Sequence, residues 1–211
     1  MPCRSTAMTK GYNMNDTLFD AVSKDAVIVG VDEAGRGPLA GRVYAAAVIL
    51  GEGGLSINGL NDSKQLSAAK RDKLFDEIVG KAAAFGIGYA DEKEIDEINI
   101  LQATFLAMRR AVKQIAMHYD YIKVDGNKYP FDSPGEAVVK GDAKVKEIMA
   151  ASILAKVSRD RYMLDMAKLY PQYEFEKHKG YGSARHIELL QKYGPSPIHR
   201  LTFGKVRELV K

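Results

Sequence analysis

Five short runs of apolar residues along the chain have the length and composition of β-strands. The first run, residues 26–31 (AVIVGV), is continuous and rich in β-branched residues, which is typical of a strand buried on both faces. The next segment, residues 32–42, is rich in glycine and proline and too short for a crossover helix, so we expect the first two strands to be antiparallel neighbours. The predicted strands cover residues 26–31, 43–50, 85–90, 121–124 and 137–140.

Four longer segments repeat apolar residues at helical spacing. Ser67 and Asn99 are suitable N-caps for the first two, because their side-chain oxygens can accept hydrogen bonds from free backbone N–H groups. Residues 148–157 are apolar nearly all round, so we expect this part of the third helix to be buried. The predicted helices cover residues 67–84, 99–118, 144–169 and 183–193, with a loop at 51–63 and an acidic segment at 91–97. This order predicts one α/β domain, a mixed sheet with helices on its faces.

The 211 residues have an ordinary globular composition, with 46% hydrophobic and 27% charged side chains. We expect a flexible tail over residues 1–24 and a single domain over residues 25–211, monomeric by default. The one cysteine, Cys3, excludes an intramolecular disulfide and favours a reducing, cytoplasmic compartment. The longest apolar run, residues 43–50, is far shorter than the roughly 20 residues of a membrane helix, so we expect no membrane association.

The charge of the chain is uneven. Residues 136–211 carry 15 basic and 9 acidic side chains, whereas residues 1–135 carry 16 basic and 18 acidic ones. A basic C-terminal third is compatible with a polyanionic partner, although a solvated surface of lysine and arginine is the commoner explanation.

Four carboxylates follow directly after predicted strands: Asp32, Glu33, Asp125 and Asp142. For any one of them the simpler explanation is that acidic residues favour strand ends, and Asp142 could also cap the following helix. Together they would repel one another unless a cation compensates, and oxygen ligands suit Mg²⁺ or Mn²⁺. Because neighbours in a strand point to opposite faces, Asp32 and Glu33 can share a site only if the strand ends or bulges there.

A short glycine-rich turn, Gly35-Arg36-Gly37, follows the first two carboxylates. Its glycines would let the backbone approach a ligand closely, and Arg36 could hold a phosphate. The pattern is weak alone, since most glycine-rich loops are simply turns, and it is neither a GxxxxGK[ST] nor a GxGxxG motif.

Motifs spread over about residues 26–208 resemble those of type 2 ribonuclease H, specifically the bacterial ribonuclease HII family. Two departures are small: Arg42 stands where the family usually has proline, and Ser183 where it usually has threonine. In chain order, the matching segments are DEAGRGPLAG (32–41), NDSKQLS (61–67), EIDEINILQA (94–103), VDGN (124–127), KGD (140–142), AASILAKVSRD (150–160), HKGYG (178–182) and PSPIHR (195–200).

The resemblance implies the ribonuclease H fold, a mixed sheet flanked by helices with a helical C-terminal extension. It implies that Asp32, Glu33, Asp125 and Asp142 hold two Mg²⁺ or Mn²⁺ ions, with Asp32 bridging them. It also implies an endonuclease that cuts on the 5′ side of ribonucleotides in RNA–DNA hybrids or in duplex DNA, leaving a 3′-hydroxyl and a 5′-phosphate. Such an enzyme removes ribonucleotides from DNA and degrades RNA primers, and no protein partner is evident from the sequence.

The resemblance further assigns substrate contacts. The main chain of Gly35, Arg36 and Gly37 would contact the 2′-hydroxyl, and Tyr181 would stack on the following deoxyribose and detect an RNA–DNA junction. Without the family, Tyr181 would be a loop aromatic filling a surface gap. Lys64 is either a phosphate contact or a solvated loop lysine. The positive charges of His178, Lys179, Arg185 and Arg200 are interpreted as contacts to the nucleic-acid backbone.

Two other function classes compete with this one. A nucleic-acid-binding protein without catalysis would be expected to lack at least one of the four carboxylates, and all are present. A phosphotransferase acting on free nucleotides would need a base pocket or a phosphate-binding loop, and the sequence shows neither.

Overall fold

A computed structural model describes residues 26–210 of the chain. The tail predicted over residues 1–24 lies outside the described residues. A mixed five-stranded sheet forms the centre of the molecule, in the order β3-β2-β1-β4-β5. The strands are β1 (Ile28–Ala34), β2 (Val43–Ile49), β3 (Ala84–Ala90), β4 (Tyr121–Asp125) and β5 (Gly135–Val138).

The expected antiparallel pairing of the first two strands is confirmed, and β3 pairs antiparallel with β2. On the other side of β1, strands β4 and β5 run parallel to it and to each other. All residues of β2 are buried, as its continuous apolar run requires in a position near the centre of the sheet. Because β1 and β4 are parallel neighbours, their carboxyl ends meet at one edge of the sheet.

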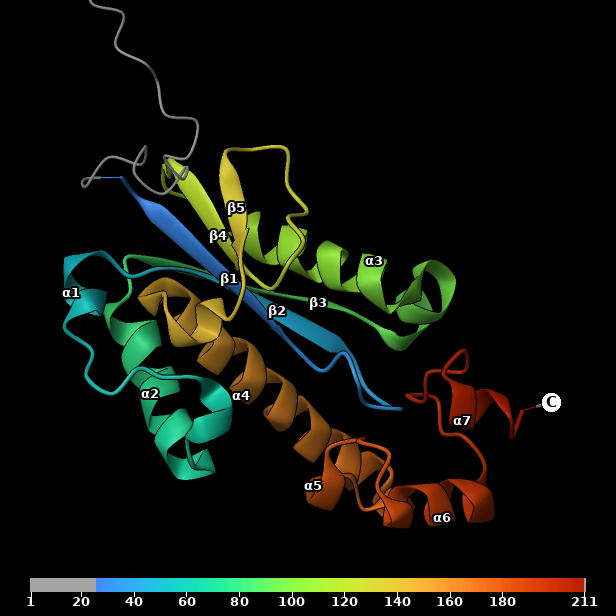
Figure 1. Ribbon diagram of the computed structural model, residues 1–211. Coiled ribbons are helices and arrows are strands. Elements are labelled where there is room, and N and C mark those ends of the chain that lie inside the picture. Colours follow the sequence, from blue (N-terminus) through green and yellow to red (C-terminus); the bar gives the residue numbers. More distant parts are fainter. Residues whose placement is uncertain (1–25, 211) are drawn as a thin grey trace, which may run out of the picture.

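Helices cover both faces of the sheet (Figure 1). The two long helices α2 (Ala68–Lys81) and α4 (Lys146–Leu169) lie on one face, and α3 (Glu92–Val112) covers the other. The central part of α4 is buried, as its apolar sequence predicts. Of the helices within residues 26–210, none is both long and apolar enough to cross a membrane. The predicted fold class, including the helical C-terminal region, is confirmed.

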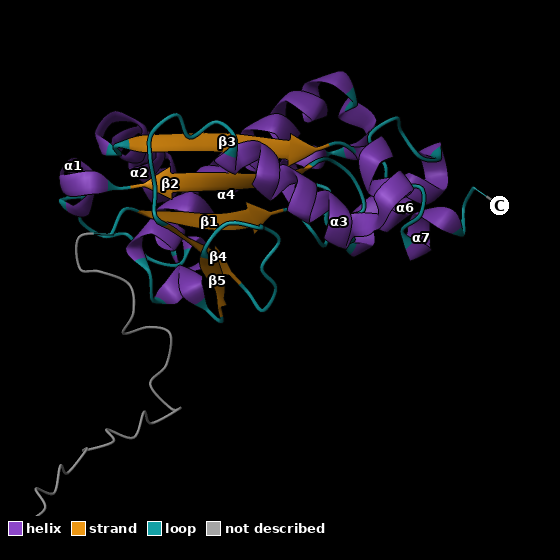
Figure 2. Cartoon of the chain, turned by 90° about the horizontal axis from the view of Figure 1, so that it is seen from above, coloured by secondary structure: helices purple, strands orange, loops and turns teal. Residues whose placement is uncertain are grey.

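The C-terminal region lies beyond the edge of the sheet toward which β1 runs, as Figure 2 shows for α6 and α7. It forms a small hydrophobic cluster of its own around Met163, Tyr173, Phe175 and Leu189. The remaining elements are short: α1 (Gly51–Leu55), η2 (Ser63–Gln65), η3 (Gly141–Ala143), η4 (Pro171–Tyr173), α5 (Phe175–His178) and α7 (Gly204–Arg207), beside the longer α6 (Ala184–Tyr193).

Several predicted boundaries are wrong, and α3 differs most. It begins at Glu92 and not at Asn99, because Asp91 and Glu94 form a reciprocal capping box. Asn99 has φ of 66° and interrupts the helix, and its side chain accepts hydrogen bonds from the N–H groups of Leu101 and Gln102 (3.0 and 3.2 Å). Asn99 therefore caps only the second part of α3.

Smaller differences affect the regions around the predicted site. Strand β1 extends three residues past the apolar run, to Ala34, and α1 forms inside the predicted loop 51–63. Asp142 does not cap α4, because it lies in η3 and the N-cap is Val145. The predicted cap at Ser67 is present, and Ser183 caps α6 in the same way, each accepting a hydrogen bond from the backbone N–H three residues ahead.

Candidate active site

Two aspartates lie side by side where the parallel strands β1 and β4 reach the edge of the sheet. The pairing of β1 with β4 ends at Val31 and Val124, so the next residues, Asp32 and Asp125, lie at the same level where the two strands part. Asp32 is 5% exposed, and its Oδ1 accepts a hydrogen bond from the N–H of Glu33 at 2.7 Å. The topology of the sheet thus places two carboxylates next to each other.

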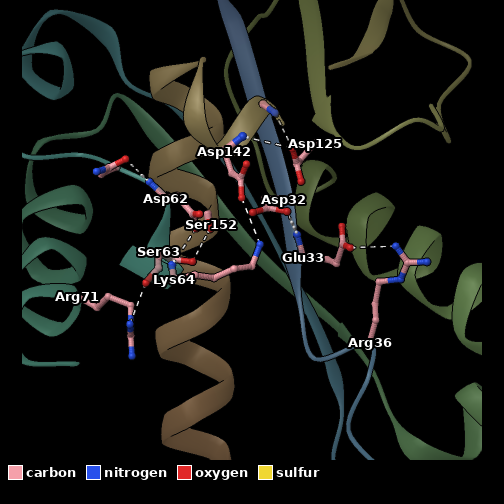
Figure 3. A network of polar contacts seen from close by, with 12 residues as sticks. Asp32, Glu33, Arg36, Asp62, Ser63, Lys64, Arg71, Asp125, Asp142 and Ser152 are labelled. Carbon is pink, nitrogen blue, oxygen red and sulfur yellow. Dashed lines mark hydrogen bonds and ion pairs between the residues drawn. The ribbon is translucent and has the colours of Figure 1, made fainter. Parts of the chain in front are cut away.

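The third carboxylate, Asp142, is carried by η3 between β5 and α4. The N–H groups of Gly141 and Asp142 donate to Oδ1 of Asp125, at 2.7 and 3.3 Å, and so hold η3 against the end of β4. Carboxylate oxygens of Asp32, Asp125 and Asp142 lie within 4.8 Å of one another (Figure 3). The structure therefore brings together three of the four predicted carboxylates.

The electrostatics of this cluster favour a bound cation. Burial, followed by the negative charges of Glu33 and Asp125, raises the pKa of Asp32 well above its usual range. Burial and the charge of Asp142 also raise the pKa of Asp125. Nζ of Lys64 lies 3.3 Å from Oδ2 of Asp142, but its side chain is 78% exposed, so solvent screens this pair. The donor set consists of carboxylate oxygens alone, which fits a hard ion such as Mg²⁺ or Mn²⁺.

Glu33 stands apart from the group of three. Because β1 continues to Ala34, Glu33 points to the face opposite to Asp32. Its Oε1 lies 3.2 Å from Nη1 of Arg36, as Figure 3 shows. Glu33, Arg36 and Asp125 line a cavity of about 160 Å³ whose opposite wall is formed by α3. Strand β1 neither ends nor bulges at Asp32 and Glu33, so the two side chains leave opposite faces of the strand. Glu33 nevertheless lies near the cluster, because its negative charge raises the pKa of Asp32 and it lines this cavity together with Asp125.

The turn after β1 is fixed by a buried arginine from the C-terminal region. Arg200 is 0% exposed and donates five hydrogen bonds of 2.6–2.9 Å to the carbonyl oxygens of Gly35, Arg36, Pro38 and Gly41. These bonds hold the backbone of the predicted ribose-binding turn in one conformation.

A second buried arginine, Arg159 of α4, lies against the same turn. A Cβ at Gly35, whose φ is +97°, would lie 2.1 Å from Nε of Arg159, so only glycine fits there. Nη2 of Arg159 donates to the carbonyls of Ala40 and Lys179, at 3.3 and 2.9 Å. Its Nε and Nη1 have no hydrogen-bond partner within residues 26–210. Arg159 thus joins the turn to the segment that carries Tyr181.

Tyr181 lies in the loop between α5 and α6 and is 47% exposed. Its ring lies beside the turn, since a Cβ at Gly37 would lie 3.9 Å from Cε1 of Tyr181. The N–H of Leu39 donates to the carbonyl of Gly180 at 2.8 Å and ties the two loops together. The structure therefore gathers Gly35–Gly37 and Tyr181, which are far apart in the sequence, into one surface.

Lys64 is placed by a buried contact between η2 and α4. Oγ of Ser63 lies 2.7 Å from Oγ of Ser152, and Nη1 of Arg71 donates to the carbonyl of Ser63 at 2.8 Å (Figure 3). The polar side chain of Ser152 partly opposes the rise in the pKa of Asp32. Ser152 was not predicted as a site residue, although its motif, AASILAKV, was part of the resemblance.

The basic residues of the C-terminal third were interpreted as contacts to the nucleic-acid backbone. This interpretation is wrong for Arg200 and weakened for Arg185 and His178. Arg200 is buried and cannot reach a ligand at the surface. Arg185 is exposed but pairs with Glu174 and Glu188, and Nε2 of His178 contacts the carbonyl of Tyr173 at 2.9 Å. Lys179 is half-buried and its Nζ donates to the carbonyl of Glu176, and it lines a groove next to α2 together with Arg71 and Arg161.

Arg42, the departure from the family pattern, is accommodated by aromatic rings. Its guanidinium carbon lies 4.2 Å from the ring centroid of Tyr89 and 4.7 Å from that of Tyr162. This double cation–π contact anchors the start of β2 without a proline.

Comparisons with known proteins agree with this geometry. Residues 29–206 match the family described as Ribonuclease HII. The chain is 54% identical to ribonuclease HII of Caldicellulosiruptor bescii over 84% of its own length and 86% of that protein, and 54% identical to that of Marinomonas sp. (strain MWYL1) over 88% and 94%. Among solved structures, it resembles ribonuclease H2 from Pyrococcus horikoshii OT3 (TM-score 0.72, 29% identity, 86% and 96% covered). The fold also matches Bst-RNase HIII, crystallised in complex with Mn²⁺ (TM-score 0.70, 15% identity, 98% and 76% covered).

Proposed function

The chain belongs to the ribonuclease HII family, and we propose that it is an endonuclease that hydrolyses the phosphodiester on the 5′ side of a ribonucleotide. The proposed substrates are RNA–DNA hybrids and duplex DNA with single embedded ribonucleotides, and the products carry a 3′-hydroxyl and a 5′-phosphate. The observation that supports it most is the approach of Asp32, Asp125 and Asp142 within 4.8 Å. The enzyme would remove ribonucleotides from DNA and degrade RNA primers in the cytoplasm.

Asp32, Glu33, Asp125 and Asp142 are the proposed ligands of two Mg²⁺ or Mn²⁺ ions, and Asp32 is the proposed shared ligand. When bound, such ions lower the pKa of a coordinated water and stabilise the charge that develops on the leaving 3′-oxygen. The Mn²⁺ complex of Bst-RNase HIII, a protein of the same fold, supports this choice of ion. Backbone N–H groups of Glu33, Gly141 and Asp142 hold the carboxylates of Asp32 and Asp125, so this part of the ligand set is organised in advance.

The chain's other residues position the substrate. The rigid turn Gly35–Gly37 would read the 2′-hydroxyl with its main chain, which is the group that distinguishes ribose from deoxyribose. The exposed ring of Tyr181, next to Gly37, would stack on the following sugar. Arg36 and Lys64 add positive charge near Glu33 and Asp142 and would contact phosphates.

The test of this function is cleavage of an end-labelled duplex that contains one ribonucleotide, with Mg²⁺, with Mn²⁺ and with chelator. We expect one cut on the 5′ side of the ribonucleotide and no cut with chelator. Cleavage of the all-DNA duplex should be slower by a factor of about 10⁴ or more, because the polar groups that bind the 2′-hydroxyl would have no partner there. Tight binding without cleavage would indicate a binding protein, and turnover of free nucleotides alone would indicate a phosphotransferase.

Replacing Tyr181 with alanine should reduce cleavage at a single ribonucleotide more than cleavage of a continuous RNA–DNA hybrid. Stacking of an aromatic ring on a base contributes about 1–3 kcal/mol. A sugar has no π face, so we expect the lower end, about 1 kcal/mol or roughly fivefold, and only the first substrate offers a deoxyribose at that position. Rates on the two substrates, measured side by side, check this. Equal losses on both would make Tyr181 a general contact.

Replacing Lys64 with glutamine should weaken substrate binding and flatten its salt dependence. Each phosphate contact adds about −0.9 to the slope of log K against log salt, so the slope should become less negative by about that amount. The control is Lys81→Gln at the C-terminal end of α2, where the lysine pairs with Glu77 at the opposite edge of the sheet. Identical slopes for both variants would mean that Lys64 is a solvated loop lysine or acts only on Asp142.

A further inference from the structure

Two buried histidines and one half-buried histidine lie directly behind the Tyr181 loop. His186 and His199 are 0% and 2% exposed, and their Nε2 atoms lie 3.0 Å apart. His178 stacks on His186 with ring centroids 4.3 Å apart and an interplanar angle of 16°. Phe175 packs against all three rings and forms an apolar wall of the cluster.

The hydrogen-bond partners assign one proton to each ring. The N–H of Ser196 donates to Nδ1 of His199 at 2.9 Å, so the proton of His199 is on Nε2 and points at His186. His186 must then accept at Nε2 and carry its own proton on Nδ1. That Nδ1 lies 2.9 Å from the carbonyl oxygen of Tyr181, which can only accept. The bonds form one directed chain from Ser196 through His199 and His186 to Tyr181.

The same cluster also holds the residue before Tyr181. Nε2 of His178 donates to the carbonyl of Tyr173 (2.9 Å), and its Nδ1 accepts from the N–H of Gly180 (3.2 Å). The backbone of Gly180 is therefore hydrogen-bonded to His178 and that of Tyr181 to His186, while the Tyr181 ring itself stays exposed. Burial lowers the pKa of His186 to about 4 and that of His199 to about 3, so both rings are neutral at physiological pH.

We propose that His186 is a positioning residue for the junction specificity of the enzyme, and that His199 acts through it by fixing the Nδ1–H form of His186. This inference rests on the proposed role of Tyr181. The chain of bonds fixes the position and orientation of the Tyr181 backbone relative to Gly37. It therefore sets where the Tyr181 ring contacts the deoxyribose that follows the ribonucleotide. No imidazole of the cluster touches the substrate or the carboxylates in this role.

The proton positions are tested first, by long-range ¹H–¹⁵N correlation spectra of the histidines in the ¹⁵N-labelled full chain. We expect His186 protonated on Nδ1 and His199 on Nε2 at neutral pH. His186→Asn serves to assign the His186 signals. A proton on Nε2 of His186 would overturn the inference, because the ring could then not donate to Tyr181.

Two variants of His186 separate its two nitrogens. The amide of asparagine can take the place of Nδ1 and that of glutamine the place of Nε2. His186→Asn should keep the rate ratio between the single-ribonucleotide duplex and the continuous hybrid within about twofold of the parent, whereas His186→Gln should lower it about five- to tenfold, the usual effect of one hydrogen bond. Equal ratios in both variants would overturn the positioning role.

Tyr181→Ala is measured beside them. An unchanged ratio in Tyr181→Ala would overturn the proposed junction sensing and this inference with it, whereas a changed ratio in Tyr181→Ala and an unchanged one in His186→Gln would overturn the inference alone. If the His186 variants fail to fold, His199→Gln, which retains an N–H at the Nε2 position, and His199→Met provide the same contrast. We then expect only His199→Met to lower the ratio, and equal ratios would overturn the inference.

Discussion

Replacing Asp32 with asparagine should abolish cleavage and leave the metal-free protein at least as stable as the parent. Metal-assisted stabilisation of the transition state contributes several kcal/mol, and each 1.36 kcal/mol is a factor of ten, so we expect a loss of about 10³-fold or more. Asparagine has nearly the same shape and can still accept the hydrogen bond from the N–H of Glu33. Cleavage rates at matched Mg²⁺ and thermal melts with chelator measure the two effects.

The stability of the metal-free protein should depend on pH in a defined direction. The pKa of Asp32 is raised in the folded state, so the folded protein retains this proton at pH values where the unfolded chain has lost it. Stability from this group is therefore fully present below the unfolded pKa, near 3.8, and is lost as the pH rises through the folded pKa. Asp32→Asn lacks this loss, so its Tm advantage over the parent should be small near pH 4 and grow toward pH 8.

Added Mg²⁺ should reverse the order of stability. A ligand that binds only the folded state at about 100 times its Kd contributes about 2.7 kcal/mol, and this gain should appear in the parent and not in the variant. Asp165→Asn is the control, because this exposed carboxylate on α4 pairs with Lys168 away from the cluster. Near-parental cleavage by Asp32→Asn, or an equal Mg²⁺ response in both proteins, would contradict the metal site.

The sequence predicted the carboxylate cluster because its members follow strands, and strand ends are visible as the ends of apolar runs. It placed the end of β1 too early, at residue 31, because apolarity reports burial and not pairing. Asp32 and Glu33 still pair with Ala46 and Ala45 of β2, whose apolar run continues opposite them. This extension places Asp32 and Glu33 on opposite faces of β1, a question that the sequence pattern alone left open.

Other structural features differ in whether a local sequence pattern could have predicted them. The Asp91–Glu94 capping box has the spacing typical of a helix start, so the beginning of α3 is visible in the local sequence. In contrast, no local pattern shows that Arg200 or Arg159 is buried beneath the turn at residues 35–41. Arginines usually lie on the protein surface, and the carbonyls of the turn that these two contact are more than 100 residues away in the sequence. The motif marked these positions, but only the tertiary structure shows what they do.

Arg200→Met should therefore destabilise the protein strongly. Burial lowers the pKa of Arg200 to about 9, which still leaves it charged at neutral pH, and the turn carbonyls supply its solvation. Methionine fits a similar volume but leaves the carbonyls of Gly35, Arg36, Pro38 and Gly41 without this donor. Each orphaned buried acceptor costs about 1–3 kcal/mol, so the sum of about 4 kcal/mol or more outweighs the relief of removing a buried charge.

A domain of this size loses roughly 2–4 °C of Tm per kcal/mol, so we expect Tm to fall by about 10 °C or more. Arg207→Met, at an exposed position of α7, should change Tm by less than about 2 °C. The Tm of Arg200→Lys should be close to that of Arg200→Met, because an ammonium offers three donors from one atom and cannot span four carbonyls. In whatever folded fraction remains, the turn is no longer fixed, so discrimination between ribose and deoxyribose should fall together with Tm. A parental Tm in Arg200→Met would show that water replaces the guanidinium, and that the turn is held by its own glycines and by Arg159.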